Sequence, residues 1–461
     1  MDKKVISLLK KVRAYALKKK VNLLVTYQEE DSFLMRFANS AISLNTNEHL
    51  VRLQLLVMDG RKKATYDMII DPREVKAALE GVDKAAEMVK HAAELNYDPT
   101  FPVFKETVVS EASYDRRLAK LTNADRLAYF NKVAAGLETD DLKLSGIFMD
   151  GTTTNAQIST ATEHYQYFRA TDAKITAVIS SESLKWEVIA EQSAQKKSDL
   201  KPVLLNKELN LLVKHYSKAK AEQLPLGKYK VVFGPAAIAE VAEIMGGWSC
   251  QGASMKRGYS FLKDGDQGTQ VLSPKFTMTD DPNRAELYGQ SHDMVGFERQ
   301  PFKLFKAGMF NNFTWDQDSA DEYGEKTTGN TVEHNSFVID GGEVSCDSLA
   351  ALIKMKRDED VLYIPYIHYI NIVNPSKGLI TGSSRFGALL LKKNGRVVVP
   401  YNVRVTQAFS DFFGERVEWL SREQVVYNTS NTYGARNPSA LLIPRFICVK
   451  DIEISHSNNS Y

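Results

Sequence analysis

Residues 50–60 read LVRLQLLVMDG, and the run from Leu50 to Val57 alternates apolar and polar side chains. Alternation with a period of two predicts a strand with one buried face. Asp59-Gly60 follows this run. Asp-Gly between two alternating runs is typical of a two-residue hairpin of type I′, because both central residues of that turn have positive φ. An antiparallel hairpin is therefore the first element that the sequence predicts.

Helices and further strands flank this hairpin. Apolar residues recur every three or four positions over residues 5–17, which predicts an amphipathic helix. Strands are expected at residues 22–27 and 33–44. A helix is expected to begin at Asp71-Pro72, with Asp as the N-cap and Pro at the first helical position. The proline-containing segment 96–102 is interpreted as an extended linker.

The next part of the chain repeats the order helix, strands, helix, although no residue-level repeat is present. Helices are expected at residues 123–137 and 207–222. Strands follow one another from residue 142, with a second Asp-Gly hairpin at Asp150-Gly151. From about residue 228, a strand leads through Gly234-Pro235 into a helix. That helix is expected to end at Gly246-Gly247, because glycine suits a left-handed C-cap.

Runs of strands that are separated from runs of helices favour an α+β fold over a parallel βαβ sheet. We expect three units in the 461 residues. The first is an N-terminal unit of helices and an antiparallel meander (residues 1–100), and the second is a helix–meander–helix unit (101–226). The third is a mainly antiparallel, barrel-like or sandwich-like C-terminal domain (227–461) with many short strands.

Composition excludes several classes of protein. Lys and Arg number 59 and Asp and Glu 57, so binding to nucleic acid through net charge is not expected. No run of 18 apolar residues predicts a membrane span. Cys250, Cys346 and Cys448 have no C-x-x-C spacing and the N-terminus has no apolar signal segment, so a cytoplasmic location is expected. The lysine-rich first helix favours a solvated face, and an anchor for nucleic acid or an acidic membrane surface is the alternative.

Local catalytic motifs are absent from the sequence. No two of the eight histidines lie within five residues of each other, which excludes H-E-x-x-H and its close variants. Phosphate-binding glycine loops and the G-x-S-x-G elbow are absent as well. A metal site built from scattered ligands, for example His292 and Asp293 with Cys250, would leave no signature. These residues are better interpreted as turn and core residues.

The order of several short segments resembles the TldD/PmbA family over nearly the full length of the chain. Each segment is weakly specific alone, but their order and spacing together indicate the family. The segments are 36–42, 59–62, Val231–Pro235, Asp280-Asp281-Pro282, His292-Asp293 with Gly296-Phe297, 306–309, Thr328-Gly329-Asn330, 335–343, Ser348-Leu349, 378–382, 386–388 and 394–397.

The family has two branches. The TldD branch is a metalloprotease with H-E-x-x-x-H on the helix after the first strand of the C-terminal domain, and with a later cysteine ligand. Without gaps, that motif falls on Glu243-Ile244 and Trp248, and no cysteine lies near residues 425–436. The chain therefore resembles the PmbA (TldE) branch. That resemblance implies a metal-free partner of a TldD-type subunit, in a hollow dimer that admits unfolded or small peptides.

The resemblance implies a cytosolic subunit with no catalytic or metal-binding residues of its own and no cofactor, since zinc is expected only in a TldD-type partner. Peptide is expected to bind by adding a strand to a sheet edge, with Asn312, Thr328, Gly329 and Asn330 as candidate contacts. No direct nucleic-acid or membrane partner is expected. The expected partner in the dimer is a TldD-type subunit or a second copy of the chain. The alternatives are a self-sufficient metallopeptidase with unrecognised ligands, and a protein-binding regulator of the type named modulator of DNA gyrase.

Overall fold

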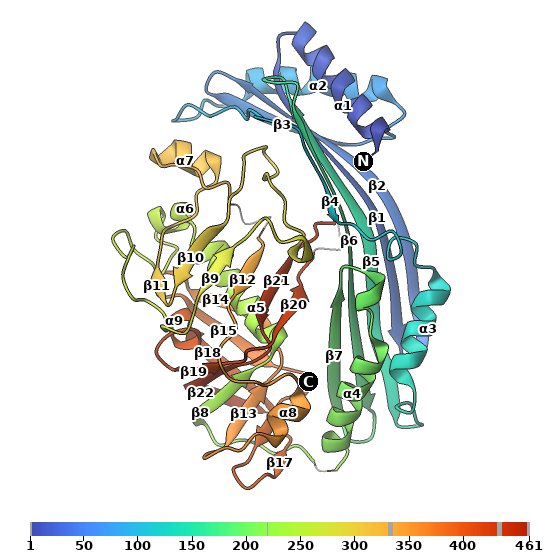
Figure 1. Cartoon of the computed structure of the whole chain (residues 1–461), viewed down its shortest axis with the longest axis vertical. Helices are drawn as coiled ribbons and strands as arrows, with labels where there is room; N and C mark the ends of the chain where they lie inside the picture. The colour runs from blue at the N-terminus through green and yellow to red at the C-terminus, as the bar shows by residue number, and fades with distance from the viewer. Residues whose placement is uncertain (1, 219, 331–334, 431–435, 459–461) are drawn as a thin grey trace.

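A long curved sheet forms one side of the molecule, and the C-terminal half lies against its concave face (Figure 1). The computed structural model describes residues 2–218, 220–330, 335–430 and 436–458. The predicted α+β class is confirmed, because helices and mainly antiparallel sheets occupy separate stretches of the chain. No helix of the described ranges is long and apolar enough to span a bilayer.

Seven strands form the N-terminal sheet, in the order β3-β2-β1-β5-β6, and β6 pairs with β4 and β7 on its other side. β1 pairs with β5 over Leu24 to Phe37, so strands of both expected N-terminal units share one sheet. The boundaries expected at residues 100 and 226 stay predictions. The strands are β1 (Asn22–Ala38), β2 (Ala41–Asp59), β3 (Lys62–Ile69), β4 (Val108–Ser113), β5 (Leu142–Ser159), β6 (Tyr165–Ser181) and β7 (Trp186–Ala194).

Four helices cover one face of this sheet, two at each end. They are α1 (Lys3–Lys18), α2 (Val75–His91), α3 (Asn123–Ala134) and α4 (Pro202–Tyr216). Side chains alternate along β1, so its odd-numbered residues point to the helices. Tyr27 packs in the cluster with α1 and α2, whereas Phe37 packs in the cluster with α3 and α4.

The even-numbered residues of β1 face the C-terminal half. Thr26 Oγ1 donates to the carbonyl of Met294 at 3.2 Å, and Gln28 Nε2 donates to the carbonyl of Arg436 at 2.8 Å. A second contact lies at the far end of the sheet, where Lys63 of β3 forms an ion pair with Asp318. Polar residues on the concave face thus join the two halves of the chain.

Two sheets build the C-terminal half. One has the order β11-β10-β9-β12-β21-β20, and the other β14-β15-β18-β22-β8-β13-β16-β17, with β19 beside β22. The strands are β8 (Gly227–Phe233), β9 (Met278–Asp280), β10 (Phe302–Lys306), β11 (Met309–Phe310), β12 (Phe337–Ile339), β13 (Val361–Ile364), β14 (Ile367–Asn374), β15 (Leu379–Ser384), β16 (Leu389–Leu391), β17 (Val397–Val398), β18 (Asn402–Ala408), β19 (Val417–Leu420), β20 (Gln424–Asn428), β21 (Ala440–Pro444) and β22 (Ile447–Asn458).

The helices of this half are short. They are α5 (Pro235–Ile244), α6 (Gly252–Lys256), α7 (Gln317–Tyr323), α8 (Leu349–Lys354) and α9 (Phe409–Phe412). Single turns complete the chain: η1 (Lys197–Asp199), the π-helical η2 (Met245–Ser249), η3 (Ala285–Leu287) and η4 (Pro375–Lys377).

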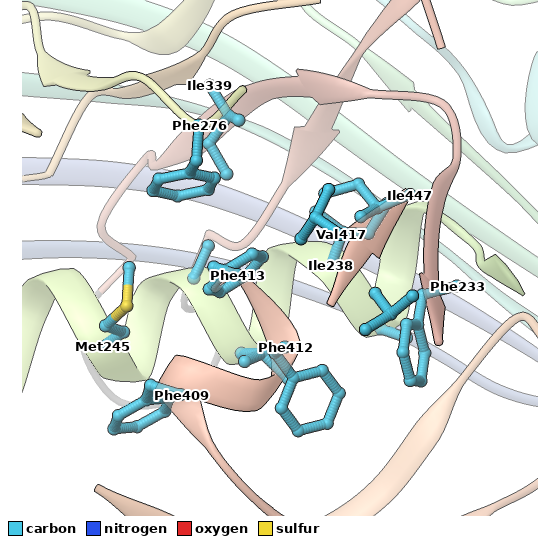
Figure 2. Packing of buried hydrophobic residues seen from close by; sticks show 14 of the residues in the cluster. Phe233, Ile238, Met245, Phe276, Ile339, Phe409, Phe412, Phe413, Val417 and Ile447 are labelled. Carbon is cyan, nitrogen blue, oxygen red and sulfur yellow. The ribbon is translucent and has the colours of Figure 1, made fainter. Parts of the chain in front are cut away.

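A single apolar core lies between the two C-terminal sheets, with α5 in its middle (Figure 2). Ile238 of α5 and Met245, the first residue of η2, lie among the aromatic rings of this core. The rings of Phe276 and Phe413 stack with their centroids 4.7 Å apart. Burying each such side chain contributes roughly 1.5–3 kcal/mol, so this core fixes α5 firmly between the sheets.

The hairpin predicted at Asp150-Gly151 is wrong. β5 continues through both residues without a turn. Asp150 is buried there and accepts hydrogen bonds from Arg126 Nε and Nη2 at 2.6 and 2.7 Å. A side chain at Gly151 would collide with the Asp31 carbonyl and the Arg436 guanidinium. Both residues serve tertiary packing, which a local turn signal does not show.

The first hairpin exists, but its turn is shifted by one residue. Asp59 pairs with Lys62, so the loop is Gly60-Arg61. Gly60 has positive φ and Arg61 does not, which excludes type I′. The strand expected at residues 33–44 is interrupted by a tight turn at Asn39-Ser40, where both residues have positive φ.

Two helix ends also differ from the prediction. α2 begins at Val75, because the Asp71 side chain accepts from the Arg73 backbone N–H instead of capping the helix. The helix after Pro235 does not end at Gly246-Gly247 but passes through them as η2. A Cβ on Gly246 would lie 2.7 Å from Phe337, so glycine serves close packing at this position and not a left-handed cap.

Candidate functional site

The two halves of the protein meet beside α5 through strand β20. Tyr427 of β20 donates from its hydroxyl to Glu191 Oε2 of β7 at 2.8 Å. Lys174 Nζ of β6 donates to the same hydroxyl at 3.3 Å and lies 4.6 Å from the centre of the Tyr427 ring. The Asn428 backbone N–H donates to Ser193 Oγ at 2.7 Å. β20 is therefore bound on the concave face of the N-terminal sheet.

Two carboxylates on α5 point toward this junction. The helix begins at Gly234-Pro235 as predicted, and its apolar face is buried in the core. Glu240 and Glu243 lie three residues apart on the opposite face, so their side chains are neighbours. Both are half-buried. We call Lys174, Glu191, Glu240, Glu243 and Tyr427 the junction cluster.

Burial dominates the electrostatics of the junction cluster. It raises the pKa of Glu240 to about 7, with a further rise from Glu243 and an opposing effect from Lys174. Burial also raises the pKa of Glu243, while a hydrogen bond from Thr429 and the charge of Lys174 act against it. Glu240 forms no hydrogen bond or ion pair with any residue in the described ranges. Its carboxyl group is thus poised to exchange a proton near neutral pH or to bind an incoming cation.

The residues on which the sequence resemblance places the family's metal motif lie at the end of the same helix. Glu243 and Ile244 belong to α5, and Trp248 belongs to η2. The indole of Trp248 is exposed and its Nε1 donates to the Tyr259 carbonyl at 3.2 Å. Zinc is held in proteins chiefly by imidazole and thiolate ligands, and these three positions offer neither.

No group of three His, Cys, Asp or Glu side chains within the described ranges is placed to hold a metal ion. The His292 ring lies against Phe104 in a tilted arrangement, with the ring centroids 5.4 Å apart, and Asp293 accepts from the backbone N–H groups of Val295 and Phe297. Cys250 is fully buried in the apolar core between the C-terminal sheets. The scattered set suggested by the sequence is therefore not assembled, and its residues are turn and core residues.

Three of the four candidate peptide contacts form a turn in which Gly329 and Asn330 are buried and Thr328 is half-buried. The Thr328 backbone N–H donates to the Trp315 carbonyl at 2.9 Å. Gly329 has a φ of +68°, and a Cβ there would collide with the Glu298 carbonyl. Asn330 is buried and its amide donates to Asp280.

Asp280 links this turn to a buried ion pair. Arg299 Nη2 donates to its two carboxylate oxygens at 3.0 and 3.1 Å, and the Ser336 backbone N–H donates to it at 2.8 Å. Asn312, the fourth candidate, is exposed and accepts from the backbone N–H of Phe313 at 2.8 Å. Contact with peptide stays a prediction for all four residues.

Sequence reasoning missed the residues that join the halves of the chain. Lys174, Glu191 and Tyr427 come from β6, β7 and β20, and no local pattern marks them. Arg436 is buried against Asp172, 264 positions away. The one available signal was the Asp-Gly pair at 150–151, whose glycine makes room for Arg436.

Comparisons with known proteins agree with this architecture. The family model described as the PmbA/TldA metallopeptidase C-terminal domain matches residues 226–456. The crystal structure of TldE from Thermococcus kodakarensis has a TM-score of 0.82 at 16% identity, covering 98% of this chain and 100% of that one. No curated protein sequence gives a significant match.

Two further crystal structures share the fold. A putative modulator of a DNA gyrase from Thermotoga maritima has a TM-score of 0.78 at 16% identity, with coverage of 97% of this chain and 99% of that chain. A putative modulator of DNA gyrase from Bacteroides thetaiotaomicron has a TM-score of 0.75 at 17% identity, with coverage of 97% and 98%. The resemblance drawn from the sequence is confirmed: the chain belongs to the PmbA/TldD family.

Proposed function

We propose that this chain is the zinc-free, PmbA/TldE-like subunit of a cytoplasmic TldD-type peptidase complex. The observation that carries the proposal is the set of side chains on helix α5. The sequence resemblance places the start of the family's metal motif on this helix, which carries Glu240 and Glu243 and no imidazole. Similarity to a TldE structure along nearly the whole chain supports the same branch.

The chemistry of the junction cluster suits the binding of peptides and not their hydrolysis. Its three carboxyl groups outnumber its one ammonium group, and an incoming peptide ammonium or guanidinium group would favour the ionised forms of Glu240 and Glu243, whose pKa values burial raises. The chain would thereby complete a chamber whose catalytic metal belongs to the partner. Asn312 and the turn at residues 328–330 remain candidate contacts for the peptide backbone.

The test is reconstitution with a TldD-type subunit from the same organism. Each chain alone and the two together are incubated with an unfolded polypeptide, and cleavage and bound zinc are measured. We expect stable association, zinc only in the partner and full cleavage only with both chains. Failure to associate, together with full cleavage by the partner alone, would contradict the proposal.

The two alternatives give different results in the same experiment. Stoichiometric zinc in this chain alone, with cleavage that chelation abolishes, would favour a self-sufficient metallopeptidase. Two of the structural neighbours carry the description modulator of DNA gyrase, so a pull-down with purified gyrase is the matching test for a regulatory protein. Binding to gyrase without any peptidase partner would favour that function.

A further inference from the structure

A small cavity lies on the face of the nine-stranded sheet that points away from the core around α5. Side chains alternate along β8, so Val231 packs in that core, whereas Val232 packs on the opposite face. Between this face and α8, the chain leaves a cavity of about 180 Å³. None of the residues that line it belongs to the junction cluster, so the cavity is a second candidate site.

The floor of the cavity is apolar. It is formed by Val232, Val361, Leu391 and Cys448, one residue from each of the neighbouring strands β8, β13, β16 and β22. All four are buried, and Leu352 of α8 packs in the same apolar cluster. An engineered apolar cavity of about 150 Å³ in another protein holds one benzene molecule. The cavity is therefore large enough for one ring-sized apolar group.

The carboxylates beside the cavity are already paired with cations. Lys230 Nζ lies 2.9 Å from Glu418 Oε2 and 3.5 Å from Asp358 Oδ1. The same ammonium group lies 2.6 Å from Glu359 Oε1, and Lys450 Nζ lies 3.1 Å from Oε1 of Glu418. An amine that entered the cavity would therefore compete with these lysines for their carboxylates.

The two cations that follow α8 have no such partner. Lys356 and Arg357 both line the cavity, and neither forms an ion pair with a residue in the described ranges. Arg357 Nη2 donates to three carbonyls at the end of α8 at 2.7–2.9 Å, but its buried Nη1 donates to no residue of these ranges. Burial lowers the pKa of this guanidinium, and only the charge of Asp360 opposes that effect. The positive charge at this end of the cavity is thus not directly paired with a carboxylate.

We propose that this cavity binds a small apolar monocarboxylate, with its apolar group on the floor and its carboxylate beside Lys356 and Arg357. A carboxylate in this position pairs with cations that lack an ion-pair partner, and hydrogen bonds between charged groups are roughly twice as strong as neutral ones. A cationic molecule of the same shape is repelled by Lys356 and Arg357 and finds the carboxylates already paired. The inference does not rest on the proposed function, because neither a peptide nor a partner subunit takes part.

Three planar compounds of nearly the same shape test the charge preference of the cavity. Benzoate is anionic at neutral pH, benzamide is neutral and benzamidine is cationic. Isothermal titration calorimetry with the full wild-type chain measures the binding of each compound. We expect benzoate to bind with a Kd of about 1 mM or tighter, benzamide to bind at least about tenfold more weakly, and benzamidine not to bind.

Two variants place the bound acid in this cavity. Arg357→Met keeps much of the aliphatic volume and removes the charge, so the affinity for benzoate should fall to that for benzamide. Met355→Trp enlarges a half-buried side chain that lines the cavity, so it should abolish the binding of both compounds. Arg257→Met is the matched control and should bind benzoate as the wild-type chain does. It removes an exposed arginine that pairs with Glu322 and does not line the cavity.

The comparison of the three compounds uses the wild-type chain, so it stays decisive if a variant folds poorly. Binding of benzamide or benzamidine as tight as that of benzoate, or no heat from benzoate at about 10 mM, would overturn the inference. An unchanged affinity for benzoate in a folded Arg357→Met or Met355→Trp chain would overturn it as well. No peptidase partner or peptide is present, so these results leave the proposed function untouched.

Discussion

Arg436 and Asp172 form a buried ion pair between the two halves of the chain. Nε and Nη2 of Arg436 donate to Oδ1 of Asp172 at 2.9 and 2.7 Å, and the side chains are 0% and 1% exposed. The Arg436 backbone N–H also donates to Glu30 Oε2 at 2.6 Å. One residue of the C-terminal half is thereby fixed to β1 and β6 of the N-terminal sheet.

Removing one partner of this pair is expected to be costly. Asp172→Asn leaves the guanidinium buried without its counter-charge, which should lower the free energy of unfolding by about 3–5 kcal/mol. Urea unfolding followed by circular dichroism measures the change. Arg396→Ala, which breaks an exposed pair with Glu222, is the control and should have a far smaller effect. Equal effects of the two substitutions would show that the buried pair does not hold the halves together.

Gly151 offers a second probe of the same contact. Its backbone is extended, but a Cβ would lie 2.3 Å from the Asp31 carbonyl oxygen and 2.7 Å from Arg436 Cζ. Gly151→Ala should therefore destabilise the fold by about 1–3 kcal/mol through overpacking. Gly60→Asn is the control, because the site is open and Asn tolerates positive φ. Thermal unfolding compares the two, and a stable Gly151→Ala protein would contradict the packing account.

Local patterns in the sequence predicted the elements that local physics determines. The apolar stripe of residues 5–17 is the buried face of α1, and Gly234-Pro235 does start α5. The same reasoning failed at Asp150-Gly151, where the turn signal is overridden by Arg126 and Arg436, and at Gly246-Gly247, where Phe337 occupies the space of a side chain. Those partners are distant in sequence, so the residues next to each glycine do not reveal that it packs against them.

The candidate site likewise combines a part that could be predicted from local sequence and a part that could not. The helix that carries Glu240 and Glu243 was predicted from the sequence, but neither glutamate was predicted to belong to a site. The cation and the tyrosine that complete the cluster come from β6 and β20, and only the pairing of β20 with the concave face brings them together. The four residues expected to contact peptide were chosen by resemblance, and the turn at 328–330 shows a packing role that the motif did not reveal.

Tyr427 connects the junction cluster through its hydroxyl. Tyr427→Phe removes the bond to Glu191 and the acceptor for Lys174 while keeping the ring. A loss of about 1–3 kcal/mol in the free energy of unfolding is expected, because the half-buried Glu191 carboxylate loses its tyrosine donor. A double-mutant cycle with Glu191→Ala, which removes the acceptor, measures the coupling directly. Additive effects of the two substitutions would show that this hydrogen bond contributes nothing.

The raised pKa of Glu240 makes stability depend on pH. The pKa is about 7 in the folded chain against a reference value of 4.5, so the folded state binds more protons between these values. Stability should therefore fall as the pH rises from about 4.5 to 7 and stay reduced above 7.

Glu240→Gln removes this dependence. At pH 8 the variant should be more stable than the wild-type chain, by roughly 1 kcal/mol after allowance for solvent screening of the half-buried group. At pH 4.5 the two proteins should differ little. Glu453→Gln, at an exposed position of β22, is the matched control. Urea unfolding at both pH values gives the comparison. A Glu240→Gln protein that gains nothing at pH 8 would show that this carboxyl group ionises in the folded protein at little cost.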